Sequence, residues 1–315
     1  MPVWGFLLSM LVALMWAVSP VLMKEGLKFC MPNDIQPIRS VSFLVSTAIL
    51  MLAFQPGRMP HVTMPLFAGL VGSTALSTLL GDLLYTYSIQ RIGASLAVSV
   101  SSGYPLITAV VSISLLGEHV TALVWFGTFL IISGLLVIKF DSSLQEKMKT
   151  PAGYVLPDRE EAAKNRANMT KGIALALGSA VCSGINIPIV KLLMVEGGWS
   201  PTESYFLRAA VFFAMAWGLR EAQHRVAPKS ISQIEKMPAI AWAALLASGV
   251  IGIGLSGVLF GKCIQEFPVS VVTPITASSP FMTALLSKIF FKETLSRVQY
   301  AGVALVIAGS VSVSL

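Results

Sequence analysis

Long stretches of this sequence contain no charged side chain and no histidine. A helix needs about 20 mainly apolar residues to cross the hydrocarbon core of a bilayer. Only helices and closed barrels satisfy their backbone hydrogen bonds there, and barrel strands would alternate in polarity over about ten residues. These runs do not alternate, so the sequence predicts an all-α membrane protein. The uncharged runs cover 1–23, 40–57, 62–81, 92–117, 120–138, 172–190, 237–261, 267–287 and 298–315.

The overall composition excludes most other classes of protein. Hydrophobic residues make up 55% of the chain and charged residues 12%, whereas about 25% of a soluble domain is charged. A soluble globule, a disordered chain, a secreted disulfide scaffold and a nucleic-acid-binding domain are therefore excluded. The three cysteines, Cys30, Cys182 and Cys263, lie far apart in the chain. We interpret them as small apolar side chains, with no metal or disulfide role.

A further segment, 204–219, is apolar except for Arg208, which brings the number of predicted helices to ten. The first run has no Lys or Arg before it and is too long for a typical signal peptide, so we expect it to be the first membrane helix. The ten predicted helices cover about 3–23, 36–54, 64–88, 93–116, 121–139, 171–194, 203–219, 238–261, 268–289 and 297–314.

The second half of the sequence repeats the first. When 89–134 is aligned with 264–309 without a gap, 12 of the 46 positions are identical. Shared apolar composition alone would not align proline, glutamine and glutamate. The identical pairs include Gln90/Gln265, Ser95/Ser270, Pro105/Pro280, Thr108/Thr283, Glu118/Glu293, Gly127/Gly302 and Gly134/Gly309. In the earlier part of each half, the matching pairs are Ser19/Asn186, Lys24/Lys191, Asp34/Glu203 and Arg39/Arg208.

The repeat predicts the organisation of the chain. Residues 1–140 and 171–315 form two five-helix copies, and the polar stretch 141–170 links them. Because five is odd, the second copy enters the membrane in the opposite orientation, which is the inverted-repeat architecture of secondary transporters. In the linker, Asp158 and Glu161 have the spacing of a capping box, which predicts a short surface helix.

The motifs of each copy resemble those of a known family. In their order along the chain they are similar to the EamA-type repeat of the drug/metabolite transporter superfamily, and the similarity covers nearly all of the chain except the linker. The second copy departs from the first where Ser183 replaces Trp16 and Lys292 replaces Gly117. The first copy carries Trp16-Ala17-Val18-Ser19-Pro20, Lys24, Arg39, Gly93-Ala94-Ser95, Pro105, Leu116-Gly117-Glu118, Gly127 and Gly134. The second carries Asn186, Lys191, Arg208, Pro280, Lys292-Glu293, Gly302 and Gly309.

The resemblance implies an inner-membrane carrier for a small metabolite, driven by a gradient. We expect a monomer or a homodimer. It does not name the metabolite, because the superfamily moves amino acids, sugars, nucleotide sugars, cations and drugs. Efflux of drugs or lipophilic cations is one alternative, and a receptor or scaffold on the same fold is another, because fold does not fix function. The sequence contains no Walker motif and no His-x3-His, Cys-x2-Cys or Gly-x-Ser-x-Gly pattern. We therefore expect no enzyme activity, cofactor or metal, and the expected partners are a small-molecule substrate, the lipid bilayer and protons.

Polar and aromatic residues inside the predicted helices are candidates for the substrate site, since small-molecule pockets combine aromatic surfaces with a few polar groups. For each residue alone, ordinary hydrogen bonding between helices is the competing interpretation. Pro105 and Pro280 match across the repeat and are candidate hinges or plain kinks. The candidate substrate-binding residues are Trp16, Ser19, Tyr85, Ser102, Tyr104, Asn186, Thr276 and Ser279.

Asp82 is the only carboxylate well inside a predicted span. An intramembrane acid costs about 2.5–3.5 kcal/mol on insertion scales, which makes it a functional-site hypothesis by default. We predict that Asp82 carries a proton, or pairs with a cationic group of the substrate, during transport. A solvated helix end or a hydrogen-bonded structural acid is the alternative. Arg39 and Arg208 are expected to reach the interface or to pair with Asp34 and Glu203.

Three further patterns predict structure rather than chemistry. Glu118 and Glu293 end the fourth helix of each copy and are expected to anchor neighbouring helices. The run 252–257 fits G-x-G-x-x-G, but it lies inside an uncharged helix, where glycines allow close packing. Most of the 22 Lys and Arg residues lie in loops 1–2, 3–4, 5–6, 7–8 and 9–10, while the other loops hold only Arg58, Lys191 and Lys262. This charge bias places both termini outside the cytoplasm, whereas the family resemblance implies termini inside; we predict the orientation from the charges.

Overall fold

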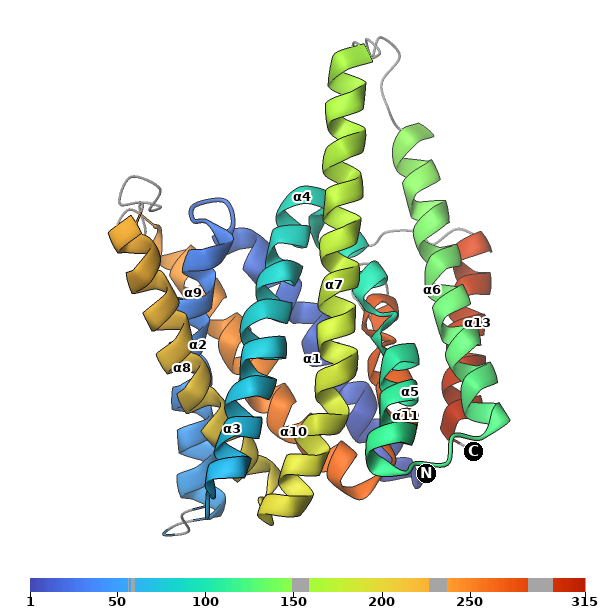
Figure 1. The fold of residues 1–315 in the computed structure, drawn as a ribbon. Coiled ribbons are helices and arrows are strands. Elements are labelled where there is room, and N and C mark those ends of the chain that lie inside the picture. Colours follow the sequence, from blue (N-terminus) through green and yellow to red (C-terminus); the bar gives the residue numbers. More distant parts are fainter. Residues whose placement is uncertain (56, 58–59, 149–158, 227–236, 283–296, 315) are drawn as a thin grey trace.

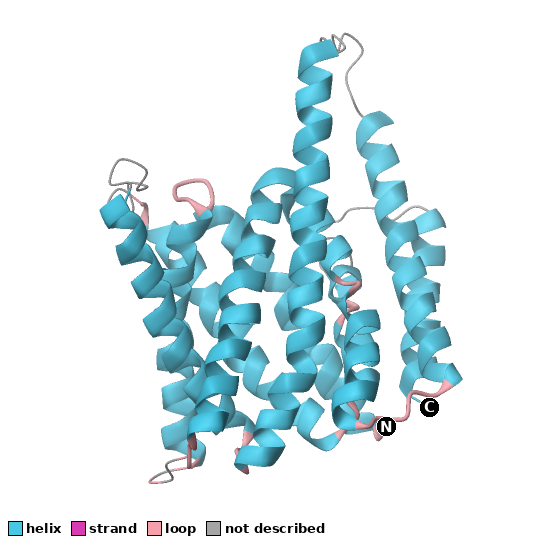
Figure 2. Ribbon diagram, viewed as in Figure 1, coloured by secondary structure: helices cyan, strands magenta, loops and turns pink. Residues whose placement is uncertain are grey.

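The computed structural model describes residues 1–315 apart from 56, 58–59, 149–158, 227–236, 283–296 and 315. In the described part every regular element is a helix and there is no strand (Figure 2). The helices stand side by side in one bundle (Figure 1). This confirms the prediction of an all-helical chain.

The first half of the chain forms the helices that run from α1 to α6. A π-helical stretch, η1 (Thr74–Gly81), joins α3 to α4. Inside α4, Gly93 has a φ of +77°, a conformation that glycine adopts without a Cβ clash. The chain therefore bends at the boundary that was predicted between the helices 64–88 and 93–116. The helices are α1 (Val3–Gly26), α2 (Pro32–Phe54), α3 (Met64–Ser73), α4 (Asp82–Ser101), α5 (Tyr104–Leu116) and α6 (Ala122–Met148).

The second half begins with a long helix and contains a second π-helical stretch. α8 starts with a capping box: the Ser200 N–H donates to Glu203 Oε2 at 2.7 Å, and the Glu203 N–H donates to Ser200 Oγ at 3.2 Å. Pro201 occupies the first helical position, where its missing N–H costs nothing. The elements are α7 (Arg159–Gly197), α8 (Pro201–Val226), α9 (Ala239–Gly249), η4 (Val250–Leu255), α10 (Ser256–Glu266), α11 (Val269–Thr276) and α13 (Arg297–Ser314).

Several predicted helix boundaries were too narrow. α2 begins at Pro32 rather than at 36, because proline suits the first turn of a helix. α7 begins at Arg159 rather than at 171. The prediction of a short surface helix near 158–161 is therefore wrong, because the residues from Arg159 onward form the first turn of a continuous 39-residue helix. Asp158, the expected cap, lies outside the described residues.

Six helical segments in the described ranges are long and apolar enough to cross a membrane. Two shorter apolar helices cover Ala122–Val137 and Ala301–Val313. By length and composition the chain is thus a multi-pass membrane protein, although this criterion alone does not give ten spans. The six segments are Val3–Gly26, Pro32–Phe54, Met64–Gly93, Leu96–Leu116, Ala167–Gly197 and Ala239–Glu266.

The two halves share irregular features at aligned positions. With the 175-residue offset of the repeat, η1 (Thr74–Gly81) aligns with η4 (Val250–Leu255). The chain breaks between α4 and α5 at Ser102 and Gly103, and α11 ends directly before the aligned residues, Ala277 and Ser278. π-helical insertions occur frequently at functional sites. The repeat seen in the sequence is therefore also a repeat of local structure.

The helices α6 and α13 make a reciprocal contact through glycine. A Cβ built on Gly127 would lie 2.6 Å from the carbonyl oxygen of Gly309, and one built on Gly134 would lie 2.5 Å from that of Gly302. Gly127 aligns with Gly302 and Gly134 with Gly309, so each contact is the symmetry copy of the other. The two helices consequently run antiparallel about a local two-fold axis (Figure 1), and this two-helix contact is called the glycine seam below.

Replacing Gly127 by alanine is expected to destabilise the folded protein by about 1–3 kcal/mol, because the added methyl group meets backbone that cannot rotate away. The measurement is the thermal unfolding midpoint of the protein in detergent. Gly218→Ala in α8 is the matched control, since a Cβ there has no atom within 4 Å. Equal midpoints for the two variants would show that the glycine seam tolerates an added methyl group.

The G-x-G-x-x-G run also allows close packing. Cβ atoms built on Gly252 and Gly254 would lie 2.1 Å from Ser19 Oγ and 2.2 Å from Ser46 Oγ. A Cβ on Gly257 would lie 2.4 Å from Cε1 of the Tyr205 ring. These glycines bring η4 and α10 against three neighbouring helices, as the sequence predicted. The cysteines Cys30, Cys182 and Cys263 are free and buried.

Both termini lie at one end of the bundle, and the last turn of α6 and the first turn of α7 lie at the other (Figure 1). α1 runs away from the terminal end, whereas its repeat counterpart α7 runs toward it. We call the end with the two termini the terminal end and the other end the opposite end.

Candidate functional site

A cavity with a volume of about 250 Å³ lies in the middle of the bundle, and both halves of the chain line it. From the first half, side chains of α1, α2, η1, α4 and α5 reach the cavity; from the second half, those of α7, α8, η4 and α10 do so. Both π-helical stretches are part of the lining, through residues such as Thr78 and Gly252. The repeat-related irregularities therefore converge on one site.

Most of the residues predicted from the sequence line this cavity. Thr276 does not: its hydroxyl lies 2.9 Å from the Tyr104 hydroxyl, so it supports a lining residue from behind. The predicted residues in the lining are Trp16, Ser19, Asp82, Tyr85, Ser102, Tyr104, Asn186 and Ser279.

Aromatic rings form one wall of the cavity. The Trp16 ring packs against Phe260 with centroids 5.1 Å apart and meets Tyr104 edge-on at 6.5 Å. Trp16 Nε1 donates to Ser256 Oγ at 3.2 Å. A tryptophan with one satisfied N–H presents a large, fixed apolar surface, which suits the apolar body of a small ligand.

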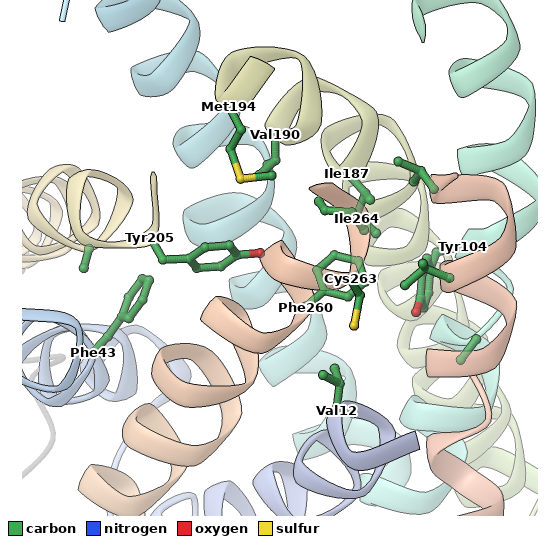
Figure 3. Close-up of a cluster of buried hydrophobic side chains, with 14 of the residues drawn as sticks. Val12, Phe43, Tyr104, Ile187, Val190, Met194, Tyr205, Phe260, Cys263 and Ile264 are labelled. Atoms are coloured by element: carbon green, nitrogen blue, oxygen red, sulfur yellow. The ribbon is translucent and has the colours of Figure 1, made fainter. Parts of the chain in front are cut away.

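Behind this wall lies a cluster of buried hydrophobic side chains, drawn in Figure 3. Tyr104, Tyr205 and Phe260 belong both to the cluster and to the cavity lining. The rest of the cluster includes residues near the ends of α7 and α10, such as Met194 and Ile264. α7 and α10 end on the terminal side of the bundle (Figure 1), so these two side chains lie between the cavity residues of the same helices and that end. Met194 and Ile264 are called the terminal-side plug below.

Asp82 forms an ion pair with Arg39 across the cavity lining, from α4 to α2. The side chain of Arg39 is 3% exposed and that of Asp82 is 20% exposed. The prediction that Arg39 pairs with Asp34 or reaches the interface is wrong, because Asp34 instead faces Arg220 at 3.6 Å. Asp82 thus lies inside the candidate span Met64–Gly93 and has a buried arginine as its partner.

Arg208 is held by neutral groups. Its Nη1 donates to Ser73 Oγ at 2.8 Å and its Nη2 donates to Thr78 Oγ1 at 3.0 Å. With the Asn186 amide oriented to satisfy both neighbours, its Oδ1 accepts from Arg208 at 3.3 Å and its nitrogen donates to the Ser73 carbonyl at 2.9 Å. The expected pair with Glu203 does not form, because the Glu203 carboxylate caps the start of its own helix.

The two matched prolines begin helical segments rather than kinking them in the middle. Pro105 is in the first turn of α5, directly after the break at Ser102 and Gly103. Pro280 lies in the helical residues 279–282 that follow the turn at Ala277 and Ser278. The chain is therefore interrupted next to each proline, close to the cavity residues Ser102 and Ser279.

Sequence reasoning missed part of the lining. Ser179 and Ser183 lie on the cavity face of α7 with Asn186, and their spacing of four and three residues is a helical-face signal that was available. Ser77 and Thr78 had no such signal, because η1 changes the helical register. Among the described residues, no group of three His, Cys, Asp or Glu side chains could hold a metal ion.

Glu118 ties three segments together at the terminal end. Its carboxylate accepts from the Val269 N–H at 2.7 Å, from the Ser270 N–H at 3.0 Å and from the Ser270 hydroxyl at 2.7 Å. Lys191 of α7 donates to it at 3.3 Å. Glu118 thus caps the start of α11, where a negative charge is favourable; Glu293 lies outside the described residues.

Glu118→Gln is expected to destabilise the protein by about 1–3 kcal/mol near neutral pH, because it weakens charge-assisted hydrogen bonds. Burial by itself would raise the pKa of Glu118, but the hydrogen bonds from Ser270 and Val269 and the charge of Lys191 lower it below its ordinary value. A lowered folded-state pKa contributes stability above the unfolded-state pKa and loses it as pH falls through the folded-state value.

The unfolding midpoints of wild type and Glu118→Gln should therefore differ above about pH 5 and converge in acid. Glu25→Gln, which breaks only an exposed pair with Lys28, is the control and should change little. A wild-type advantage that persists unchanged below pH 3 would contradict the lowered pKa.

Comparison with known proteins agrees with this arrangement. The sequence model described as "EamA-like transporter family" matches residues 3–140 and again residues 170–315. No curated protein sequence matches the chain. A solved structure titled "Crystal structure of protein" has the same fold, with a TM-score of 0.71, 15% sequence identity, and coverage of 99% of this chain and 98% of that one. The two matched segments together include most of the chain, the cavity residues among them, so this multi-pass membrane protein belongs to the EamA-like transporter family.

Proposed function

We propose that this protein is a secondary active transporter that carries a small metabolite across the cytoplasmic membrane by alternating access. The observation that supports it most is the cavity, which both copies of the repeat line with polar and aromatic side chains. Secondary transporters built from inverted repeats bind substrate near the midplane, where discontinuous helices meet.

The proposed topology is ten spans in two inverted five-helix copies, 1–140 and 171–315, joined by the linker 141–170. The antiparallel glycine seam supports the inversion, because it relates α6 to α13 by a two-fold axis across the helices. The placement of both termini at one end supports an even number of spans.

The proposed binding residues are Trp16, Ser19, Tyr85, Ser102, Tyr104, Asn186 and Ser279, with Thr276 as a support for Tyr104. The cavity volume of about 250 Å³ lies just below the roughly 300–1,000 Å³ of pockets for drug-sized ligands. The proposed substrate is accordingly a small metabolite, with multidrug efflux as the alternative. Pro105 and Pro280, next to the helix breaks, are the proposed hinges.

In the proposed cycle, two features hold the terminal side closed. One is the terminal-side plug and the other is the tie from Glu118 to Lys191 and the start of α11. Opening toward the terminal end requires both to separate, and alternating access follows if the opposite end closes in turn.

Asp82 is the proposed coupling residue. A proton that binds its carboxylate would remove the negative charge that holds Arg39, and the ion pair between α4 and α2 would then open. The movement of helices could in this way depend on a proton. A carrier that exchanges substrates without a titrating group is the competing account.

The decisive experiment is flux into proteoliposomes that contain only this chain. Saturable uptake or exchange of a small metabolite, absent from empty liposomes, is the expected result. A folded chain that binds such a metabolite but never moves it would support the receptor or scaffold alternative instead.

Membrane orientation gives a separate test. From the positive charges of the loops we predict that the linker lies in the cytoplasm and both termini lie outside. A single cysteine introduced between 141 and 170, in a variant that lacks Cys30, Cys182 and Cys263, should resist an impermeant thiol reagent added to intact cells and react after permeabilisation. Labelling from outside intact cells would reverse the predicted orientation.

A further inference from the structure

The cavity contains two buried arginines at aligned positions of the repeat, and among the residues that the structure describes only one of them has a carboxylate partner. Arg39 and Arg208 are 2% and 4% exposed. Arg39 is paired with Asp82. The position that aligns with Asp82 in the second copy is Gly257, which carries no side chain and faces the Tyr205 ring. The second copy therefore contains the counterpart of the arginine but not that of the acid.

The hydrogen-bond partners of Arg208 are all uncharged. They are the hydroxyls of Ser73 and Thr78 and the amide of Asn186. Within the described ranges Arg208 forms no ion pair, and the Glu203 carboxylate, one turn away, is engaged at the helix start. Hydroxyl and amide oxygens satisfy the N–H donors of a guanidinium but do not neutralise its charge.

The charges that line the cavity therefore do not balance. Arg39 and Asp82 cancel, and Arg208 leaves the lining with one net positive charge. A buried charge is costly unless it is paired. An anion that enters the cavity would supply the missing partner, and its binding would gain from a cation that is already fixed and largely desolvated.

We infer that the substrate carries one carboxylate and a net charge of −1, and that the Arg208 guanidinium binds this carboxylate. The inference rests on the proposed transport function and specifies its substrate class. A planar guanidinium matches a carboxylate with two parallel hydrogen bonds, for which Ser73 and Thr78 would give up their present bonds. The apolar body of the substrate would lie against Trp16 and Phe260.

The net positive charge of the lining also distinguishes a monocarboxylate from other classes of substrate. A lipophilic cation would add a second positive charge beside Arg208, so the lining disfavours it. A phosphate monoester carries about −1.5 to −2 near pH 7, which overcompensates a single positive charge. A carboxylate on a small apolar body is the simplest species that balances the site.

The first test measures binding by the purified full-length protein in detergent. The probes are four compounds on one aromatic body: phenylacetate, phenylacetamide, 2-phenylethylamine and benzyl phosphate. A parallel set carries the same four groups on an aliphatic body, that of 4-methylpentanoate. The readout is the ligand-dependent rise in the unfolding midpoint, which reports binding to the folded state.

In at least one of the two sets, the carboxylate should raise the midpoint most. The amide, which has nearly the same shape, should have little effect, and the amine should have none. A larger rise with the amide, the amine or the phosphate, or no rise with either carboxylate, would overturn the assignment.

Variants of the Arg208 site provide the second test. Arg208→Gln should weaken carboxylate binding by about 30-fold or more, while Arg225→Gln, which alters an exposed pair with Glu221, should leave it unchanged. Thr78→Asp places a carboxylate where a hydroxyl now accepts from Arg208. It should raise the midpoint of the ligand-free protein and abolish the response to carboxylates.

Thr78→Asn is the matched neutral control and should keep that response. A carboxylate response that survives Thr78→Asp would contradict the role of Arg208, as would equal loss in Thr78→Asp and Thr78→Asn. Because Thr78→Asp is expected to gain stability, a failure to fold cannot imitate the predicted result.

These outcomes are distinguishable from failure of the transport proposal. Carboxylate binding without flux would leave the substrate class intact and remove the transport function. Flux that is confined to amines or neutral compounds would leave transport intact and remove the carboxylate.

Discussion

Asp82→Asn is expected to lower the stability of the folded protein and to abolish substrate accumulation driven by a pH gradient. The loss of stability follows from the ion pair, because Arg39 is buried and would remain charged without its partner. Removing one member of a buried pair costs about 3–5 kcal/mol. The loss of uphill transport follows from the proposed coupling role, since asparagine cannot bind and release a proton.

A double variant separates these two effects. Arg39→Gln combined with Asp82→Asn removes both charges, so it should recover most of the stability that the single variant loses while uphill transport stays absent. Exchange of substrate for substrate need not be lost, and Asp82→Glu should keep partial activity with a shifted pH profile. The measurements are the unfolding midpoint in detergent and accumulation in liposomes with an imposed pH gradient. Full uphill transport by the double variant would exclude Asp82 from coupling.

Trp16→Ala and Asn186→Ala are each expected to reduce substrate flux by at least about tenfold, with the protein still folded. Trp16 offers the largest flat surface of the cavity wall, and its loss removes aromatic contact with the ligand. Asn186 contacts both Arg208 and the Ser73 backbone. A hydrogen bond to a charged group contributes about 1.5–3 kcal/mol.

The control is Trp4→Ala on the same helix as Trp16. Trp4 is 46% exposed and packs against Phe267 away from the cavity. It should transport normally. Flux at the wild-type level in both cavity variants would assign Trp16 and Asn186 to helix packing.

The sequence predicted those features that depend on local pattern. Uncharged runs of membrane length predicted helices, and the matched Gly127/Gly302 and Gly134/Gly309 pairs identified the repeat whose helices meet at the glycine seam. The side of the first helix that carries Trp16 and Ser19 was also predicted, because aromatic and polar residues inside apolar helices are rare enough to be noticed.

Pairing between distant residues was not predictable from local pattern. Arg39 and Asp82 are 43 residues apart, whereas Asp34 lies one turn from Arg39 and was the natural expectation. The contact of Arg208 with Thr78 depends on η1, whose π-helical register has no distinct sequence signal. Tyr205 and Phe260 look like ordinary core residues in the sequence, and only their placement shows that they border the cavity.

The glycine seam has a consequence for the proposed cycle. In the proposed cycle, each copy of the repeat adopts the conformation of the other. A contact between two residues is then replaced by the contact between the residues that align with them in the repeat, and the cavity lining changes with it. The Gly127–Gly309 and Gly134–Gly302 contacts are already counterparts of each other, so the exchange converts this pair of contacts into itself. In the proposed cycle, the seam on the two-fold axis would therefore be a fixed pivot common to both access states, which gives its four glycines a mechanical reason to stay small.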